Sequence, residues 1–469
     1  MGVTRSTTPA SPAPGGDGGG SRRPPNGGKA TTTSTFVESL AAAWAIPELR
    51  NRITFVFAMF GVYVIGLHVP LPSVNHEALK TFFERGNGGI LNLVDVFSGG
   101  ALKNFTVFAM GIVPYINASI IMQLLTFAIP QWQELAREGE SGRKRIAQYT
   151  RYLTVVLALV QSCGLGTLLW SQNILPHSPW LFVHMIFTLI AGTSFLMWLG
   201  EMITDKGIGN GVSLIIFAGI MVRLPQQLVM VGKEVADKAV SPLQVLVLFL
   251  AFFATVIGIV FVTLGQRRIP IQHVRRIVGN KMTQGGMSYL PFRIASAGVI
   301  PIIFAISIVL LPLTFAQYIP DHGSGFGHWI NGVAQAFAPG KPGIQGILSS
   351  LVYALIIVGF TYFYTAITMD IPHIAEDLKK YGSYIPGIRP GRPTEEYLDR
   401  VMTRITLAGA LFLALVALLN YWIPAWTNTG NSFTLVGGTS LLIVVGVALD
   451  TMQAIEAQLL MRHYEGFIR

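Results

Sequence analysis

The chain has 469 residues, of which 51% are hydrophobic and only 12% are charged, whereas ordinary soluble domains carry about 25% charged residues. A soluble fold cannot bury so much apolar helix, so the composition predicts a protein that uses lipid as its solvent. The formal net charge of +10 could indicate nucleic-acid binding, but the positions of the basic residues indicate membrane topology instead.

The N-terminal region divides into two segments. Residues 1–35 are rich in Gly, Pro, Ser and Thr and lack the apolar run of a cleavable signal, so we expect a disordered tail. Residues 36–52 place apolar side chains at helical spacing and end with Arg50 and Arg52. This pattern predicts an amphipathic helix lying at the cytosolic interface.

Ten apolar stretches follow, and a helix needs about 20 apolar residues to cross the hydrocarbon core. Because every backbone group must be paired inside lipid, we expect these stretches to be helices. The predicted spans are residues 53–69, 105–129, 152–171, 180–200, 211–231, 243–265, 294–317, 347–369, 404–424 and 438–455.

Basic residues fall mainly on one side of this arrangement. The N-terminal side and the loops after the even-numbered spans hold 25 Lys and Arg residues, and the other loops hold 6. Cytosolic loops of membrane proteins carry the excess of basic residues. Both termini are therefore predicted to be cytosolic, in agreement with an even number of spans.

Residues 91–102, between spans 1 and 2, are too apolar for a free loop but too short and too polar to cross the membrane. A re-entrant segment fits, because non-spanning backbone at membrane depth must be buried in protein or face water. An extracytosolic surface helix is the alternative, and the residues alone leave both open.

Span 2 carries amide side chains that are costly in lipid unless they are paired or hydrated. Asn117 and Gln123 are these amides, and Gln161 in span 3 is a possible partner. Pro114 is predicted to kink the helix. The single cysteine, Cys163, lies in an apolar setting and is predicted to be a small core residue rather than a reactive thiol.

Two cytosolic loops are longer than a connection between helices requires. Residues 266–293 and 370–403 are both rich in Lys and Arg. Their length and charge predict docking onto an anionic partner, which could be rRNA phosphates, an acidic protein face or lipid headgroups.

The same residues disfavour two other functions. A secondary transporter normally keeps buried ionisable groups for ion coupling, whereas the spans here are nearly free of them. His68, His184, Asp370 and Asp450 lie near span ends. An intramembrane aspartyl protease would need Asp370 and Asp450 within reach of each other, and both are expected near the cytosolic surface. No enzyme, metal site or cofactor is predicted.

A series of longer motifs resembles the SecY/Sec61 α family of protein-translocation channels over residues 36–469. The matching segments are 97–101 (FSGGA), 108–116 (FAMGIVPYI), 139–142 (GESG), 148–152 (QYTRY), 195–201 (FLMWLGE), 207–211 (GIGNG), 265–268 (GQRR), 297–301 (AGVIP), 385–391 (IPGIRPG) and 437–443 (GGTSLLI).

This resemblance implies an all-α polytopic membrane protein with ten transmembrane helices in two inverted five-helix halves, residues 53–231 and 232–469, around a central hourglass pore. It implies a channel that moves unfolded secretory proteins across the bacterial cytoplasmic membrane and releases membrane proteins sideways into it. A secondary transporter is the alternative function.

The resemblance also implies roles for individual residues. A ring of apolar side chains would seal the pore, and a plug over residues 91–103 would fill its outer funnel. Spans 2 and 3 would face spans 7 and 8 across a lateral gate. The ring residues are Ile112, Ile116, Val212, Ile216, Ile303 and Ile443; the plug residues are Val94, Phe97, Ser98, Gly99 and Gly100; the polar gate residues are Asn117, Gln123 and Gln161.

The implied partners are SecE-like and SecG-like small membrane subunits, the SecA motor, the ribosome through its rRNA phosphates, signal peptides, nascent chains and membrane lipids. The motor or the ribosome would dock on the two basic loops. The docking residues are Arg267, Arg268, Arg275, Arg276 and Lys281 in the first loop and Arg389 in the second.

Overall fold

The structure is a computed structural model that describes residues 41, 43–72, 74–84, 95, 98–238, 240–273, 277–278, 281–282, 286–295, 298–318, 325, 332, 344–427 and 438–465. Some of the predictions fall outside these residues and stay predictions. They are the tail 1–35, the plug residues Val94 and Phe97, and the docking residues Arg275 and Arg276.

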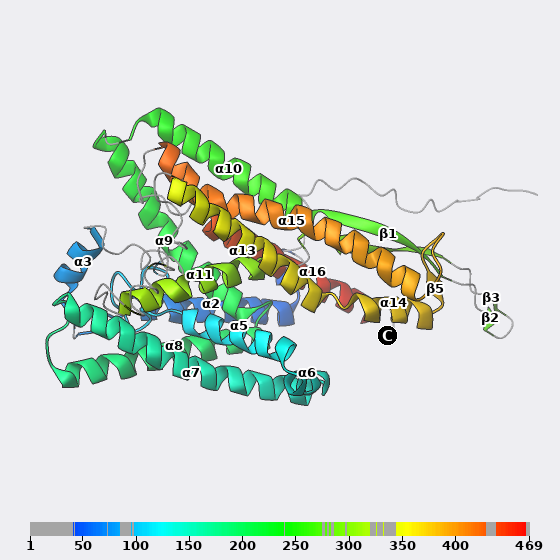
Figure 1. Cartoon of the computed structure of the whole chain (residues 1–469), viewed down its shortest axis with the longest axis horizontal. Helices are drawn as coiled ribbons and strands as arrows, with labels where there is room; N and C mark the ends of the chain where they lie inside the picture. The colour runs from blue at the N-terminus through cyan, green and yellow to red at the C-terminus, as the bar shows by residue number, and fades with distance from the viewer. Residues whose placement is uncertain are drawn as a thin grey trace, which may run out of the picture.

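Long apolar helices occupy all ten predicted spans and lie side by side (Figure 1). They are α2 (Pro47–Leu67), α5 (Val113–Ala128), α7 (Glu140–Ser171), α8 (Pro179–Lys206), α9 (Gly211–Ala236), α10 (Pro242–Leu264), α11 (Ile300–Tyr318), α13 (Ile344–Thr368), α15 (Arg392–Thr427) and α16 (Gly438–Glu465).

Not every helix meets the requirements for a span by itself. Among the described residues, eight helices are long and apolar enough, and α5 with α6 (Pro130–Arg137) forms a ninth, bent by 100°. In α11 the apolar stretch found is the shorter Ile300–Val309. The multi-span helical membrane fold is confirmed, whereas the count of ten crossings stays a prediction.

Local sequence signals explain where several helices begin. Proline occupies the first turn of α2, α5, α8 and α10, where its fixed φ suits the helix and its missing N–H costs nothing. The Asn210 side chain caps α9 by accepting hydrogen bonds from the backbone N–H groups of Val212 and Ser213. Ser241 and Gln244 form a reciprocal capping box at the start of α10.

Three helix boundaries differ from the predicted ones. Helix α2 begins at Pro47 and so includes the end of the segment 36–52. Residues 41 and 43–45 before it are also helical, and a separate interfacial helix over 36–52 stays a prediction. Span 2 begins at Val113 rather than at residue 105. Pro114 therefore starts this helix instead of kinking it. Helix α7 begins at Glu140, so most of the charged loop before span 3 is helical.

The helices form two groups. In the first group α2 contacts α8 and α9, α5 contacts α7, and α8 contacts α7 and α9. In the second group α10 contacts α15 and α16, and α13 contacts α11 and α15. The groups meet where α9 contacts α16 and where α11 contacts α5 and α7. These contacts agree with two halves of five helices each.

Two glycines allow unusually close approach between neighbouring segments. A Cβ atom on Gly192 of α8 would lie 2.1 Å from the carbonyl oxygen of Val107, and one on Gly438 of α16 would lie 1.7 Å from that of Val416 in α15. Only glycine fits at such distances. The first contact fixes the chain that precedes α5 against the first half.

A small sheet accompanies the membrane helices, outside the predicted spans. Strands β1 (Gln266–His273), β4 (Met287–Arg293) and β5 (Ser383–Tyr384) form an antiparallel sheet in the order β4-β1-β5, and β2 (Ile277–Val278) pairs with β3 (Lys281–Met282). The sheet lies at the same end of the molecule as α6 and α14 (Ile371–Lys380), opposite α3 (His76–Glu84) (Figure 1).

Candidate channel site

The six ring residues predicted from the resemblance belong to one apolar cluster. Four of them are buried members of the cluster, and two are half-buried side chains packed against it. The buried members are Ile112, Ile116, Ile216 and Ile443, and the half-buried ones are Val212 and Ile303.

These side chains come from both halves of the protein. Ile112 is the N-cap residue of α5, and the backbone N–H of Ile116 donates to its carbonyl oxygen at 3.1 Å. Val212 and Ile216 stand one turn apart on α9, whereas Ile303 lies on α11 and Ile443 on α16. The structure therefore brings together residues that are separated along most of the sequence.

The chain just before α5 is irregular and buried. Residues 98–112 form consecutive turns rather than helix or strand, and Ser98, Ala101 and Phe105 are fully buried. We call residues 98–112 the buried segment. It includes residues 98–102 of the stretch 91–102, of which the structure otherwise describes only Asp95. The choice between a re-entrant segment and a surface helix for 91–102 therefore stays a prediction.

Two predicted plug residues give the buried segment its sharp turns. Gly99 and Gly100 have φ of +69° and +87°, which side chains with a Cβ atom rarely adopt. A Cβ atom on Gly99 would lie only 3.0 Å from Cα of Gly219 in α9. The Tyr63 hydroxyl of α2 donates to the carbonyl oxygen of Ser98 at 3.4 Å. The segment is thus held against both α2 and α9.

A seam runs between the helix pairs expected to form the gate. Helix α11 contacts α5 and α7, and Phe127 of α5 meets Phe363 of α13 edge to face with ring centroids 5.5 Å apart. This aromatic contact links the first half to the second across the seam. We refer to this contact region as the gate seam.

The predicted polar lining of the gate is arranged differently from expectation. Gln123 Nε2 donates to Ser119 Oγ at 3.2 Å on its own helix, not across to Gln161 in α7. Asn117 is buried, and its Oδ1 has no hydrogen-bond partner among the described residues. A buried amide oxygen without a donor is costly, so Asn117 is poised to accept a hydrogen bond from water or another chain.

The two docking loops form one structural unit. Strand β5 of the second loop pairs with β1 of the first, with Gln272 opposite Tyr384 and His273 opposite Ser383. The His273 ring contacts Ser383 Oγ at 2.7 Å through Nδ1 and Ser288 Oγ at 2.9 Å through Nε2, so it links all three strands.

Three of the basic residues predicted to dock a partner are exposed on this unit. Arg267 and Arg268 are exposed on β1 and Arg389 is exposed in the second loop, above a small apolar cluster that includes Ile269, Ile385 and Leu398 among others. The backbone of Lys281 lies in β3, opposite Val278. The sequence predicted both loops but not that they join.

One ionisable residue lies well inside a span and was missed by the sequence analysis. Arg223 is in the middle of α9, and its Nη2 lies 2.9 Å from Oδ2 of Asp95, which is fully buried. The spans are thus nearly free of ionisable groups, as expected, but Arg223 is an exception. A charge within an apolar helix marks a functional position by default, and Asp95 in an apolar run is a second signal of the same kind.

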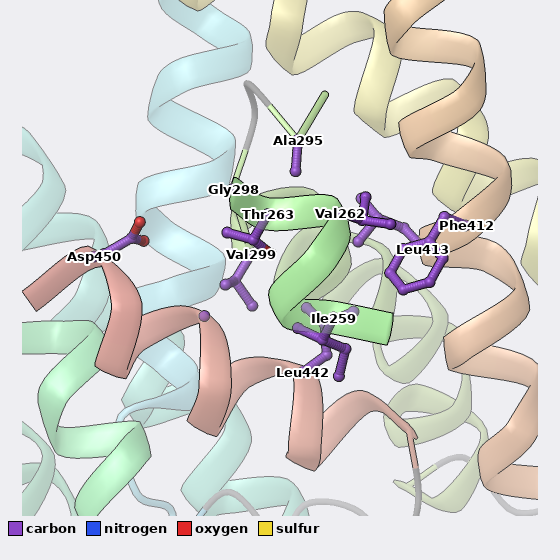
Figure 2. A pocket seen from close by; sticks show the side chains of 11 residues that line it. Ile259, Val262, Thr263, Ala295, Gly298, Val299, Phe412, Leu413, Leu442 and Asp450 are labelled. Carbon is purple, nitrogen blue, oxygen red and sulfur yellow. The ribbon is translucent and has the colours of Figure 1, made fainter. Parts of the chain in front are cut away.

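The two carboxylates considered for proteolysis lie in different settings. Asp370 caps α14 by accepting from the backbone N–H of His373 at 3.2 Å. Asp450 borders a small recess between α10, α15, α16 and the connection into α11 (Figure 2). The recess includes none of the ring, plug, gate or docking residues. Among the described residues, no group of three His, Cys, Asp or Glu could hold a metal ion.

Comparisons with known proteins agree on one family. The SecY family model matches residues 106–452. The protein translocase subunit SecY of Aquifex aeolicus (strain VF5) is 42% identical over 440 residues, which is 92% of this chain and 99% of the relative. The subunit of the same name from Streptomyces scabiei is 41% identical over 445 residues, with the same coverage of both chains.

Solved structures show the same fold at lower identity. One described as a protein conducting channel has a TM-score of 0.61 and 17% identity, covering 89% of this chain and 96% of the other. The Sec61 channel in a canine ribosome-channel complex has a TM-score of 0.58 and 16% identity, with the same two coverages. Sequence and structure therefore lead to one conclusion: the chain belongs to the SecY family of protein translocase subunits.

Proposed function

We propose that the chain forms a pore through which unfolded secretory proteins cross the bacterial cytoplasmic membrane and from which membrane proteins pass sideways into lipid. The observation that carries this proposal is the joining of Ile112, Ile216, Ile303 and Ile443, from four helices of both halves, in one apolar cluster. Apolar constrictions exclude water and ions when they are narrow. Branched alkyl groups bond to no particular sequence, so such a ring can close around any passing chain.

The plug would be residues 91–103, whose described part includes the start of the buried segment. Its burial against α2 and α9 supports a role in closing the idle pore. A structural relative is described as having a plug domain that stabilises the closed state of the translocation channel. For this chain the same role is our proposal, with Ser98, Gly99 and Gly100 at the inner turn.

The lateral gate would be the gate seam. Helices α5 and α7 belong to the first half and α11 and α13 to the second, and contacts between halves at this seam involve few elements. Such a seam can open by rigid-body movement of the halves. Asn117 supports this assignment, because its unpartnered oxygen could be satisfied once the seam is hydrated or filled by a signal peptide.

The docking surface would be the sheet built from both basic loops. It faces the cytosol in the orientation that the basic residues predict, which also places both termini in the cytosol. Relatives of this fold have been solved bound to ribosomes, and rRNA phosphates or the acidic face of a SecA motor would suit Arg267, Arg268 and Arg389.

SecE-like and SecG-like subunits would cover lipid-facing helices. Energy for transport would come from the docked partner.

A secondary transporter is not favoured. Arg223 is an intramembrane charge, but it is paired with Asp95 of the chain itself and so offers no free coupling group. Transport of polypeptide also matches the translocase names of the relatives.

Cysteine capture tests the proposed pore. With Cys163→Ser as background, Ile112→Cys or Ile303→Cys should form a disulfide with a cysteine placed in a stalled secretory substrate, because the ring encloses the chain in transit. Leu250→Cys is the control, since this α10 side chain is 69% exposed and lies outside the ring cluster. Capture at Leu250 alone, or at no position, would contradict a central polypeptide path.

Charge removal tests the docking surface. We expect Arg267→Gln with Arg268→Gln to weaken binding of SecA or of ribosomes about tenfold at low salt, because interfacial charges steer and hold an anionic partner. Binding is measured with the purified channel in membranes over a series of salt concentrations. Arg143→Gln with Lys144→Gln removes the same charge from exposed sites on α7. Equal weakening by this control pair would show that only net charge matters.

A further inference from the structure

Asp95, which precedes the buried segment, forms an ion pair with Arg223 of α9 in the interior of the protein. Asp95 is 0% exposed and the Arg223 side chain 13% exposed. Taking two charges out of water is costly, and a buried pair is stable only while both partners remain in place. The pair therefore depends on the segment staying where it is.

Asp95 also organises the turn that follows it. Its Oδ1 accepts the backbone N–H of Lys103 at 2.9 Å, and its carbonyl oxygen accepts the Ser98 hydroxyl at 3.1 Å and the backbone N–H of Gly100 at 3.0 Å. The ion pair with Arg223 is thus connected through Asp95 to both ends of the turn from residue 98 to residue 103.

The buried segment also approaches α9 at a second place. Gly219 stands one turn before Arg223, and its Cα would lie 3.0 Å from a Cβ atom on Gly99. Residues four apart share one face of a helix, so the turn lies along a single face of α9. Lys103 is another cation near Asp95, and its ammonium lies over the ring of Phe83. Arg223, with Nη2 2.9 Å from Asp95 Oδ2, forms the ion pair.

The pair is strong only while the site is dry. The attraction between opposite charges falls steeply as the local dielectric rises towards that of water. In addition, Arg223 Nη1 is buried without a hydrogen-bond partner in the described part of the chain, so water entering the site would satisfy a group that closure leaves unsatisfied. A contact made by apolar packing alone contains no charge pair for water to weaken and no unsatisfied polar group for water to bind.

We propose that Asp95 and Arg223 form a latch that holds the buried segment against α9 in the idle channel and releases it when water or an incoming polypeptide enters. This inference rests on the proposed channel function. It adds the device that keeps the closed state closed until the pore is hydrated, and it assigns that device to one ion pair.

A double-mutant cycle tests the latch in the assembled channel complex. Asp95→Asn and Arg223→Gln should each raise the resting ion conductance in planar bilayers by about tenfold, and should raise the transport of a substrate lacking a signal peptide to the same extent. The reason is that each change removes part of the free energy that favours the closed state over the open state. The double variant should leak no more than either single variant, since the pair is lost only once. Arg223→Lys, which keeps the charge, should leak less than Arg223→Gln.

Matched controls separate the latch from misfolding and from the channel function itself. Arg151→Gln removes a different ion pair, to Glu201 between α7 and α8 at 2.7 Å, and should leave conductance at the wild-type level. All variants should still transport a normal signal-bearing substrate. Wild-type conductance in both single variants, or additive leaks in the double variant, would overturn the latch. Failure of the wild-type chain to transport any substrate would instead overturn the proposed function.

Discussion

Replacing all six ring residues with serine should make the idle channel permeable to small ions. Each serine hydroxyl binds water, so the constriction stays wet instead of excluding water and ions. We expect the resting conductance to rise at least about tenfold, since the barrier to ions in an apolar constriction comes from the missing hydration. The measurement is a planar-bilayer recording of the purified complex without substrate.

Six changes in one cluster also weaken the protein, because shortening a buried Ile costs about 2–5 kcal/mol at each fully buried site. A milder variant, Val212→Ser with Ile303→Ser, changes only the two half-buried ring members and should leak in the same direction. The control replaces all six residues with leucine, which keeps the ring apolar and should keep it sealed. Conductance unchanged in both serine variants would end the ring assignment.

Helix positions could be predicted because lipid imposes one strong rule. Every backbone group must pair internally, so an apolar run as long as 243–265 forms a helix, observed here as α10. The start of span 2 was missed for a physical reason. Residues 105–112 are as apolar as a span, but the left-handed turn at Gly111, with φ of +58°, and the N-terminal preference of Pro114 begin the helix only at Val113.

The two basic loops show what the charge pattern can predict and what it cannot. Length and basic charge predicted that both loops act outside the membrane, but the antiparallel pairing of β1 with β5 joins segments far apart in the sequence. Such pairing leaves no local signature, since register depends on the partner strand. The same is true of the latch: Asp95 and Arg223 each stand out in an apolar run, but only the fold shows that they meet.

Locking the gate seam should stop translocation. In a Cys163→Ser background, Phe127→Cys on α5 and Phe363→Cys on α13 replace two rings that meet edge to face. A short, cleavable bifunctional thiol reagent should join them, since Phe127 is 60% exposed and open to reagent. With the two halves tied together, we expect transport of a signal-bearing substrate to fall at least about tenfold, because opening requires the halves to move apart.

The control for this experiment uses the same reagent with two cysteines on a single helix. Phe360→Cys with Phe363→Cys places both thiols on α13, where the two rings are 6.2 Å apart, so the same reagent modifies the channel without crossing the seam and transport should continue. Cleaving the reagent in the Phe127–Phe363 variant should restore transport, which excludes damage by the reagent. Full transport through a channel bridged from α5 to α13 would show that polypeptide passes without separation of the two halves, and the seam would then not be a gate.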